Sequence, residues 1–151
     1  MGDDREPLRY RRSRFATRLP REHRYSGGHL WVARQERDLW RVGFTRFATR
    51  MLGEPVEVDF EVREGEAIER GQEVGWIEGF KAVTDIYTPM GGRFAGANPT
   101  LETEVEAVAH DPYRRGWLFL VEGTPGEDLV GADGYTAILD ETIDRMTGRD
   151  A

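Results

Sequence analysis

The chain has 151 residues, of which 38% are hydrophobic and 32% charged, with a formal net charge of −7. This length suits one domain with a single core. The absence of cysteine excludes disulfides, thiolate metal sites and a cysteine nucleophile. No apolar run reaches the roughly 20 residues that span a bilayer, and the first residues lack the apolar segment of a secretory signal. We therefore expect a cytoplasmic protein, or one of the mitochondrial matrix if the source is eukaryotic.

The charge is divided unevenly along the chain. Residues 1–50 carry 13 arginines against 6 acidic residues, whereas residues 51–151 carry 7 arginines and one lysine against 22 acidic residues. The acidic body would repel phosphates, which argues against nucleic-acid binding. The basic start predicts a solvated, flexible extension over residues 1–24, although it could also dock on an acidic partner. No metal site is expected, because the three histidines lack ligand spacing: His23, His29 and His110.

The body of the protein is predicted to span residues 25–145, with a short tail over residues 146–151. Aromatic and β-branched residues bounded by charged or glycine-containing turns indicate short strands in its first half. The predicted elements there are a hairpin over residues 29–35 and 39–48, a helical turn over 46–52 ended by Gly53, a half-buried strand over 56–62 and a turn over 63–72 bracketed by Gly65 and Gly71.

The second half continues the pattern and ends in a helix. Its predicted elements are strands over residues 73–80 and 82–90, a glycine-rich turn with a short strand over 91–98, an acidic helical segment over 100–108, a central apolar strand over 116–123 and a helix capped by Asp133. Many short strands with one terminal helix predict a mostly β fold. We expect a flattened β-barrel or sandwich with short helices at its edge.

Lys81 is the only lysine in a chain that otherwise uses arginine for positive charge. It falls between two predicted strands, so its amine is expected at a loop tip that other proteins can reach. An arginine would keep the charge but could not act as a nucleophile, because the guanidinium stays protonated. A primary amine can be acylated and its long stem can then serve as a tether. The alternative is that one lysine survived the arginine bias by chance.

The residues around Lys81 resemble the lipoyl-bearing segment of the glycine cleavage H protein family. The family segment runs Glu-Ser-Val-Lys-Ala-Val-Ser-Asp-Val-Tyr-Ser-Pro, and this chain has Glu-Gly-Phe-Lys-Ala-Val-Thr-Asp-Ile-Tyr-Thr-Pro over residues 78–89. Further stretches resemble family segments in the same order: "HLWV", "VGFTRFA", "LGE", "DPYRRGWL" and "DLVGADGYTAIL". The resemblance covers residues 25–140.

This resemblance implies a lipoyl/biotinyl-type flattened barrel, a barrel–sandwich hybrid, with lipoate covalently attached to Lys81. It implies a non-catalytic, monomeric carrier with a swinging arm that brings the aminomethyl group from glycine decarboxylase to aminomethyltransferase. Dihydrolipoyl dehydrogenase would then reoxidise the arm. A biotinyl carrier has the same kind of fold, but its lysine usually lies between methionines, whereas Lys81 is flanked by Phe80 and Ala82.

Two further residues acquire candidate roles from the resemblance. Glu78, three positions before Lys81, would be a recognition point for the attaching enzyme, a lipoate ligase or an octanoyltransferase. The alternative for Glu78 is an ordinary exposed strand acid. His29 matches a family histidine and would contact the loaded arm, and the alternative for His29 is a packed structural histidine.

Several positions depart from the family pattern. Gly79 and Phe80 replace the common Ser-Val before the lysine, Leu30 replaces an acid, and an Arg-Arg pair at residues 114–115 replaces Gly-Glu. These changes affect the surface offered to partners more than the fold. Two alternatives to a glycine-cleavage carrier therefore remain: an H-like lipoyl carrier of another pathway, such as sulfur oxidation, and an unlipoylated adaptor that only binds partners.

Overall fold

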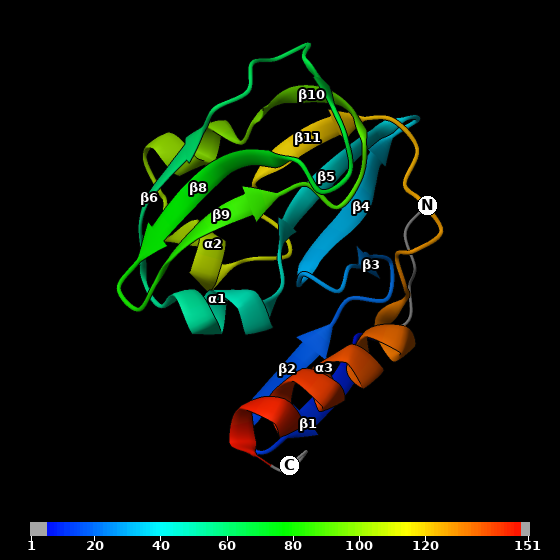
Figure 1. Cartoon of the computed structure of the whole chain (residues 1–151), viewed down its shortest axis with the longest axis vertical. Coiled ribbons are helices and arrows are strands. Elements are labelled where there is room, and N and C mark those ends of the chain that lie inside the picture. The colour runs from blue at the N-terminus through cyan, green and yellow to red at the C-terminus, as the bar shows by residue number, and fades with distance from the viewer. Residues whose placement is uncertain (1–5, 149–151) are drawn as a thin grey trace.

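The computed structural model describes residues 6–148, which form a mostly β structure (Figure 1). Its strands are β1 (Leu8–Arg12), β2 (Phe15–Leu19), β3 (Arg24–Tyr25), β4 (Leu30–Glu36), β5 (Leu39–Phe44), β6 (Pro55–Phe60), β7 (Ala67–Ile68), β8 (Glu73–Gly79), β9 (Val83–Tyr87), β10 (Gly92–Ala97) and β11 (Phe119–Glu122). The helices are α1 (Arg46–Leu52), the 3-10 turn η1 (Pro99–Glu102), α2 (Ala107–His110) and α3 (Ala132–Thr147). None of the helices within residues 6–148 is long and apolar enough to cross a membrane.

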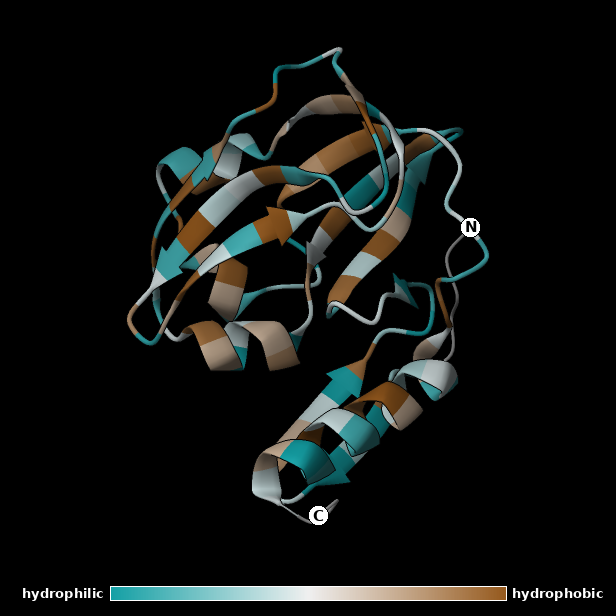
Figure 2. Ribbon diagram, in the orientation of Figure 1, coloured by the Kyte–Doolittle hydropathy of each residue, from teal (hydrophilic) through white to brown (hydrophobic). Residues whose placement is uncertain are grey.

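Two antiparallel sheets pack face to face around the main core. The larger has the strand order β3-β4-β5-β11-β10-β7, and the smaller has the order β6-β8-β9. Phe60 of the smaller sheet lies 5.7 Å, between ring centroids, from both Phe94 and Phe119 of the larger one. Figure 2 shows apolar residues on β4, β5 and β11 of the larger sheet, and also on β9 of the smaller sheet and on α3. The predicted flattened, mostly β fold is confirmed, as an open sandwich whose two sheets do not pair with each other in the described residues.

The central strand of the larger sheet and the first helix follow the sequence predictions. The predicted central strand is β11, which pairs with both β5 and β10 and buries Phe119 and Val121 completely. Helix α1 begins where the hydroxyl of Thr45 accepts a hydrogen bond from the amide of Ala48, and it ends at Gly53. Such a polar N-cap and glycine end are typical of short helices.

The acidic segment after β10 differs from the prediction. Instead of one helix over residues 100–108, the chain forms the 3-10 turn η1 and then the single turn α2. Asn98 starts η1, because its side chain accepts from the amide of Thr100 and donates to the carbonyls of Arg115 and Trp117. These bonds tie the segment to the approach to β11, which favours short turns over a continuous helix.

The basic start of the chain is folded, so the prediction of a flexible extension over residues 1–24 is wrong for residues 8–19. Strands β1 and β2 form an antiparallel hairpin beside α3, in a lobe at one end of the molecule (Figure 1). Phe15 and Leu19 are buried there. The alternation of apolar and basic side chains every two residues is typical of a strand. In this segment the many arginines make that alternation hard to recognise in the sequence. Residues 1–5 lie outside the described part.

Helix α3 completes this lobe. Its N-cap is Gly131, so the predicted cap Asp133 instead lies in the first turn, and the helix continues to Thr147, beyond the predicted limit at residue 145. Acidic residues of α3 form hydrogen bonds with side chains of the hairpin. The Tyr10 hydroxyl donates to Asp140 at 2.7 Å, and Arg12 forms two 2.7 Å bonds with Asp144. The buried side chains of α3 are Ala132, Tyr135, Leu139 and Ile143.

Candidate functional site

Lys81 lies in the tight turn between β8 and β9, as predicted. The turn is closed by a 2.8 Å hydrogen bond from the Gly79 amide to the Ala82 carbonyl. The amide of Lys81 donates to the carbonyl of Leu52 at 3.0 Å, and the amide of Phe80 donates to the carbonyl of Glu54, also at 3.0 Å. Because the backbone of the turn is bonded to the end of α1 and the start of β6, the lysine side chain projects from a fixed base.

Two glycines allow this close approach. A side chain at Gly53 would place its Cβ 2.8 Å from Lys81 Cγ, and one at Gly79 would place its Cβ 2.3 Å from the Leu52 carbonyl oxygen. Both distances are too short for real atoms. Gly53 also has a φ of 78° and a ψ of −167°, a combination that is essentially restricted to glycine. The docking of α1 against the turn therefore depends on glycine at both positions.

The amine of Lys81 is accessible for chemistry. The side chain is exposed, and its Nζ donates to the Arg50 carbonyl at a long 3.4 Å. Within residues 6–148 it makes no ion pair with a carboxylate. Acylation of this amine would therefore break one weak hydrogen bond and leave no buried charge unpaired.

Exposed apolar side chains surround the turn. Phe80 is 80% exposed and Val83 is 68% exposed, on either side of Lys81. In the described part of the chain, five of the six exposed large apolar residues lie on α1, β6 and the β8–β9 unit: Met51, Val56, Phe80, Val83 and Tyr87. Exposed apolar patches of this kind mark surfaces that contact other molecules.

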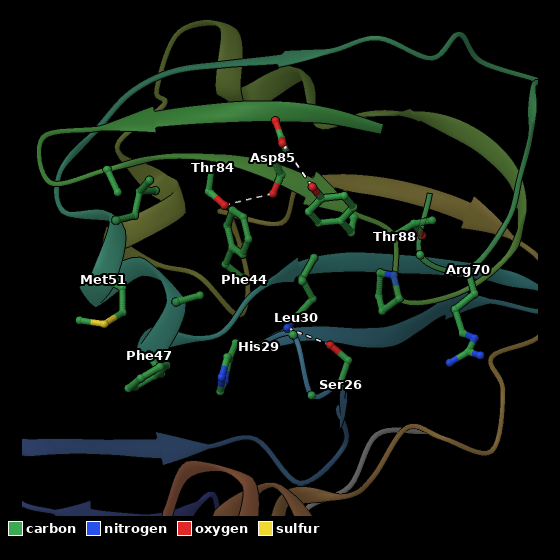
Figure 3. A pocket seen from close by; sticks show the side chains of 18 of the residues that line it. Ser26, His29, Leu30, Phe44, Phe47, Met51, Arg70, Thr84, Asp85 and Thr88 are labelled. Carbon is green, nitrogen blue, oxygen red and sulfur yellow. Dashed lines mark hydrogen bonds between the residues drawn. The ribbon is translucent and has the colours of Figure 1, made fainter. Parts of the chain in front are cut away.

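A cleft of about 590 Å³ opens beside β9 (Figure 3). One wall is formed by β9 with Thr84 and Asp85, and the other by the start of β4 and by α1 with Phe47 and Met51. Most of the lining is apolar, as is usual for ligand sites. Ala82 and Val83, which follow Lys81 directly, line the same cleft, so the lysine stands at its edge.

His29, the predicted arm contact, lines this cleft but is held by the protein itself. Its Nδ1 lies 2.7 Å from the Tyr135 hydroxyl, which lies 2.9 Å from the Thr45 hydroxyl. Its ring also packs on Phe47 with centroids 4.7 Å apart. Burial lowers the pKa of His29 to about 4, so the imidazole is neutral at pH 7. His29 is therefore packed against the protein's own residues, and its side chain also forms part of the cleft wall.

Glu78, the predicted recognition residue, lies outside the cleft. It is half-buried on β8, and its cross-strand neighbours are Glu57 on β6 and Val83 on β9. Glu78 therefore belongs to the surface of the β6-β8-β9 sheet, together with the acidic residues of β6.

Sequence reasoning missed two features of the site. Ser26 lines the cleft and accepts a 3.2 Å hydrogen bond from the Leu30 amide, which shapes the loop before His29. Glu54 contacts the His110 imidazole at 3.1 Å, beside the anchor of the Lys81 turn. The Ser-Gly-Gly run before His29 signalled a loop. Nothing local signalled the second contact, because its partners lie 56 residues apart.

Comparison with known proteins adds to this geometry. The family model for the glycine cleavage H-protein matches residues 23–142. The chain belongs to this family. It is 37% identical over 127 residues to a glycine cleavage system H protein of Photorhabdus laumondii, covering 82% of this chain and 96% of that protein. It is 40% identical over 127 residues to the one of Edwardsiella ictaluri, covering 82% and 98%.

A solved structure shows the same fold. The crystal structure of a glycine cleavage system H protein from Mycobacterium marinum aligns with a TM-score of 0.70 and 30% sequence identity, over 79% of this chain and 97% of that one. Strands β1 and β2 precede the residues that match the family model, so the hairpin is additional to the matched region. The family is one of lipoyl carriers, in agreement with an exposed lysine beside a mostly apolar cleft.

Proposed function

We propose that Lys81 carries a lipoyl group in amide linkage, and that the protein is the carrier of the glycine cleavage system. It would take the aminomethyl group from glycine decarboxylase to aminomethyltransferase and then meet dihydrolipoyl dehydrogenase. The observation that carries the proposal is that the single lysine of an H-family chain lies exposed on an anchored turn beside an apolar cleft. These partners imply work in the cytoplasm, or in the mitochondrial matrix of a eukaryote.

The residues present fit the implied group. Lys81 offers an amine without a carboxylate partner in residues 6–148, and the cleft beside it has mostly apolar walls suited to a hydrocarbon chain. Bound lipoate would supply a dithiolane, the two sulfurs that this cysteine-free chain lacks, for reversible redox and group-transfer chemistry.

The protein's own residues would then position the arm rather than catalyse. The bonds from the turn to Leu52 and Glu54 hold the base of the arm, and the exposed Phe80 and Val83 offer contacts to each partner enzyme. A neutral His29 adds no charge beside Leu30 and Phe47, the apolar part of the cleft wall. A tether of this kind works by raising the effective concentration of its end group at successive active sites.

We also propose that Glu78 is read by the enzyme that attaches the group, a lipoate ligase or an octanoyltransferase. It lies on the same strand as the start of the turn and next to Val83, which supports contact with an enzyme that approaches Lys81. His29 is proposed as a wall residue for the loaded arm.

Intact mass followed by reconstitution tests the proposal. Protein from the native cell should carry one lipoyl amide, and Lys81→Arg should carry none. The lipoylated form should support CO2 exchange with glycine decarboxylase, and the variant should lose that activity by at least about 10³-fold, because no other nucleophilic amine is available on a side chain. An unmodified native protein would indicate an adaptor. A lipoylated protein that is inactive with glycine decarboxylase would indicate a carrier of another pathway.

A further inference from the structure

The outer face of the β1–β2 hairpin is an array of arginines. Alternation along the strands places Leu8, Tyr10 and Arg12 toward α3, and the residues between them point away. On the outer face Arg9 is paired directly with Arg18 across the strands, and Arg11 with Ala16. Arg14, in the hairpin turn, is exposed as well. We call Arg9, Arg11, Arg14 and Arg18 the basic face.

The arginines of the basic face differ from those that build the lobe. Arg12 is bonded to Asp140 and Asp144 of α3, and Arg21 lies 3.7 Å from Asp133. Within residues 6–148, none of the four basic-face arginines makes an ion pair or a side-chain hydrogen bond. Like charges directly opposite each other on paired strands are destabilising. The positive charge on this face therefore does not stabilise the folded hairpin.

The basic face also has a shape suited to contact. A shallow groove of about 560 Å³ runs over the hairpin and is lined by Arg9, Tyr10, Arg11, Ala16, Thr17 and Arg18. Three of these six lining residues are arginines of the basic face. Guanidinium is the cation that pairs with carboxylates in a bidentate geometry, so such a lining suits a carboxylate-bearing surface.

The hairpin is linked to the Lys81 turn through α1. Phe15 of β2 packs edge-to-face on Phe47 of α1 with centroids 5.4 Å apart, and the Arg50 guanidinium lies 5.9 Å from the Phe15 ring. The carbonyl of Arg50 accepts the bond from Lys81 Nζ. In Figure 1, α1 lies between the β8–β9 turn and the lobe of β1, β2 and α3. A protein that engages Lys81 over α1 therefore comes close to the hairpin.

We propose that the basic face docks on a carboxylate-rich surface of one of the enzymes that act on the group at Lys81. This inference rests on the proposed function and adds a partner-binding element outside the residues that match the family model. Phosphate-bearing partners fit less well, because α3 beside the hairpin bears Asp133, Asp140, Glu141 and Asp144 and residues 51–151 carry 22 acids. These charges would repel a long duplex or a membrane surface, whereas a protein partner need present carboxylates only opposite the hairpin.

A charge-matched pair of triple variants tests the proposal. One replaces Arg9, Arg11 and Arg18 with glutamine, and the control replaces Arg34, Arg63 and Arg93, exposed arginines outside the hairpin, in the same way. Both lose three positive charges. For each lipoylated protein, kcat and the KM for the carrier are measured with glycine decarboxylase, aminomethyltransferase and dihydrolipoyl dehydrogenase at low and high salt.

The basic-face variant should raise the KM with at least one enzyme about tenfold at low salt, with kcat unchanged and the effect reduced by added salt. The control should stay within about twofold of wild type. Circular dichroism and the extent of lipoylation, both expected to be unchanged, show that the variants fold. Equal KM values for both variants with all three enzymes would overturn the proposal.

Binding to phosphates is the other outcome to be measured. Wild type and the basic-face variant are mixed with duplex DNA and with vesicles containing phosphatidylglycerol. Arginine-dependent binding to either at physiological salt, without a KM effect, would overturn the docking proposal in favour of a phosphate partner. If wild type carries no lipoyl group, the proposed function and this inference fail together. If it is lipoylated and active, a negative result removes this inference alone.

Discussion

At the scale of single residues, Gly53 sets how closely α1 approaches the turn that carries Lys81. Its backbone lies in a region that only glycine enters without strain, and its missing side chain leaves room for Lys81. Its amide also ends α1 by bonding to the Thr49 carbonyl at 3.0 Å. Gly53 therefore ends the helix, allows the turn to pack closely against it and so fixes the position of the reactive amine.

Gly53→Ala should lower the free energy of unfolding by at least about 2 kcal/mol, because backbone strain and a Cβ contact with the Lys81 backbone nitrogen at 3.0 Å act together. Urea unfolding measures this change. The matched control is Gly27→Ala, where a new Cβ would meet nothing within 4 Å, and its effect should stay within about 0.5 kcal/mol. Equal effects of the two substitutions would contradict the role of Gly53.

At the scale of elements, the β1–β2 hairpin and α3 depend on each other. A two-stranded hairpin is marginal by itself in water, and this one is stabilised by packing on α3 and α1. Phe15 and Leu19 are its buried apolar side chains, and Phe15, 7% exposed, packs edge-to-face on Phe47. The polar contacts from Tyr10 and Arg12 to α3 set the register of the lobe.

Phe15→Ala should destabilise the protein by about 3 kcal/mol, the usual result of removing a buried aromatic ring. Amide hydrogen exchange should show the loss of protection first in β1 and β2, and Lys81 should still be modified, because the turn is anchored by other contacts. Ala16→Ser, on the exposed side of the same strand, should be close to neutral. A Phe15→Ala protein with unchanged exchange and stability would show that the hairpin does not depend on this packing.

The elements also show what the sequence could predict and what it could not. The Lys81 turn, α1 with its terminal Gly53 and the central strand β11 were predictable, because periodicity and glycine punctuation are local signals. The hairpin was not recognised, because its stability comes from contacts with α3 some 130 residues away. The hydrogen-bond partner of His29 was equally inaccessible, since Tyr135 is 106 residues distant.

At the scale of the whole molecule, an aromatic layer joins the lobe of α3 and the hairpin to the β-sandwich. Tyr25 stacks on Tyr135 with centroids 4.8 Å apart. His23 packs edge-on against Trp31 at 4.5 Å, and His29 lies between Phe47 and Tyr135. The buried His23 and the half-buried His29 thus belong to the layer that packs the lobe against the sandwich.

Burial of these two histidines makes the stability depend on pH. Burial lowers the pKa of both His23 and His29 to about 4, from an ordinary value near 6.5. Above about pH 6.5 they are neutral in the folded and the unfolded chain, so they contribute no pH dependence. Between about pH 6.5 and 4 the unfolded chain binds protons that the folded one does not. The free energy of unfolding therefore decreases as the pH is lowered through this range. Each histidine contributes a slope of at most about 1.4 kcal/mol per pH unit.

Urea unfolding of the wild type at pH 7.5, 6 and 5 should therefore show a progressive loss of stability below pH 6.5. His23→Gln and His29→Gln should each be less stable than wild type at pH 7.5 but lose less on acidification, since one titrating group is gone. Parallel pH profiles for wild type and both buried-site variants would mean that these imidazoles titrate alike in the folded and unfolded chain, and that the aromatic layer admits a charged ring.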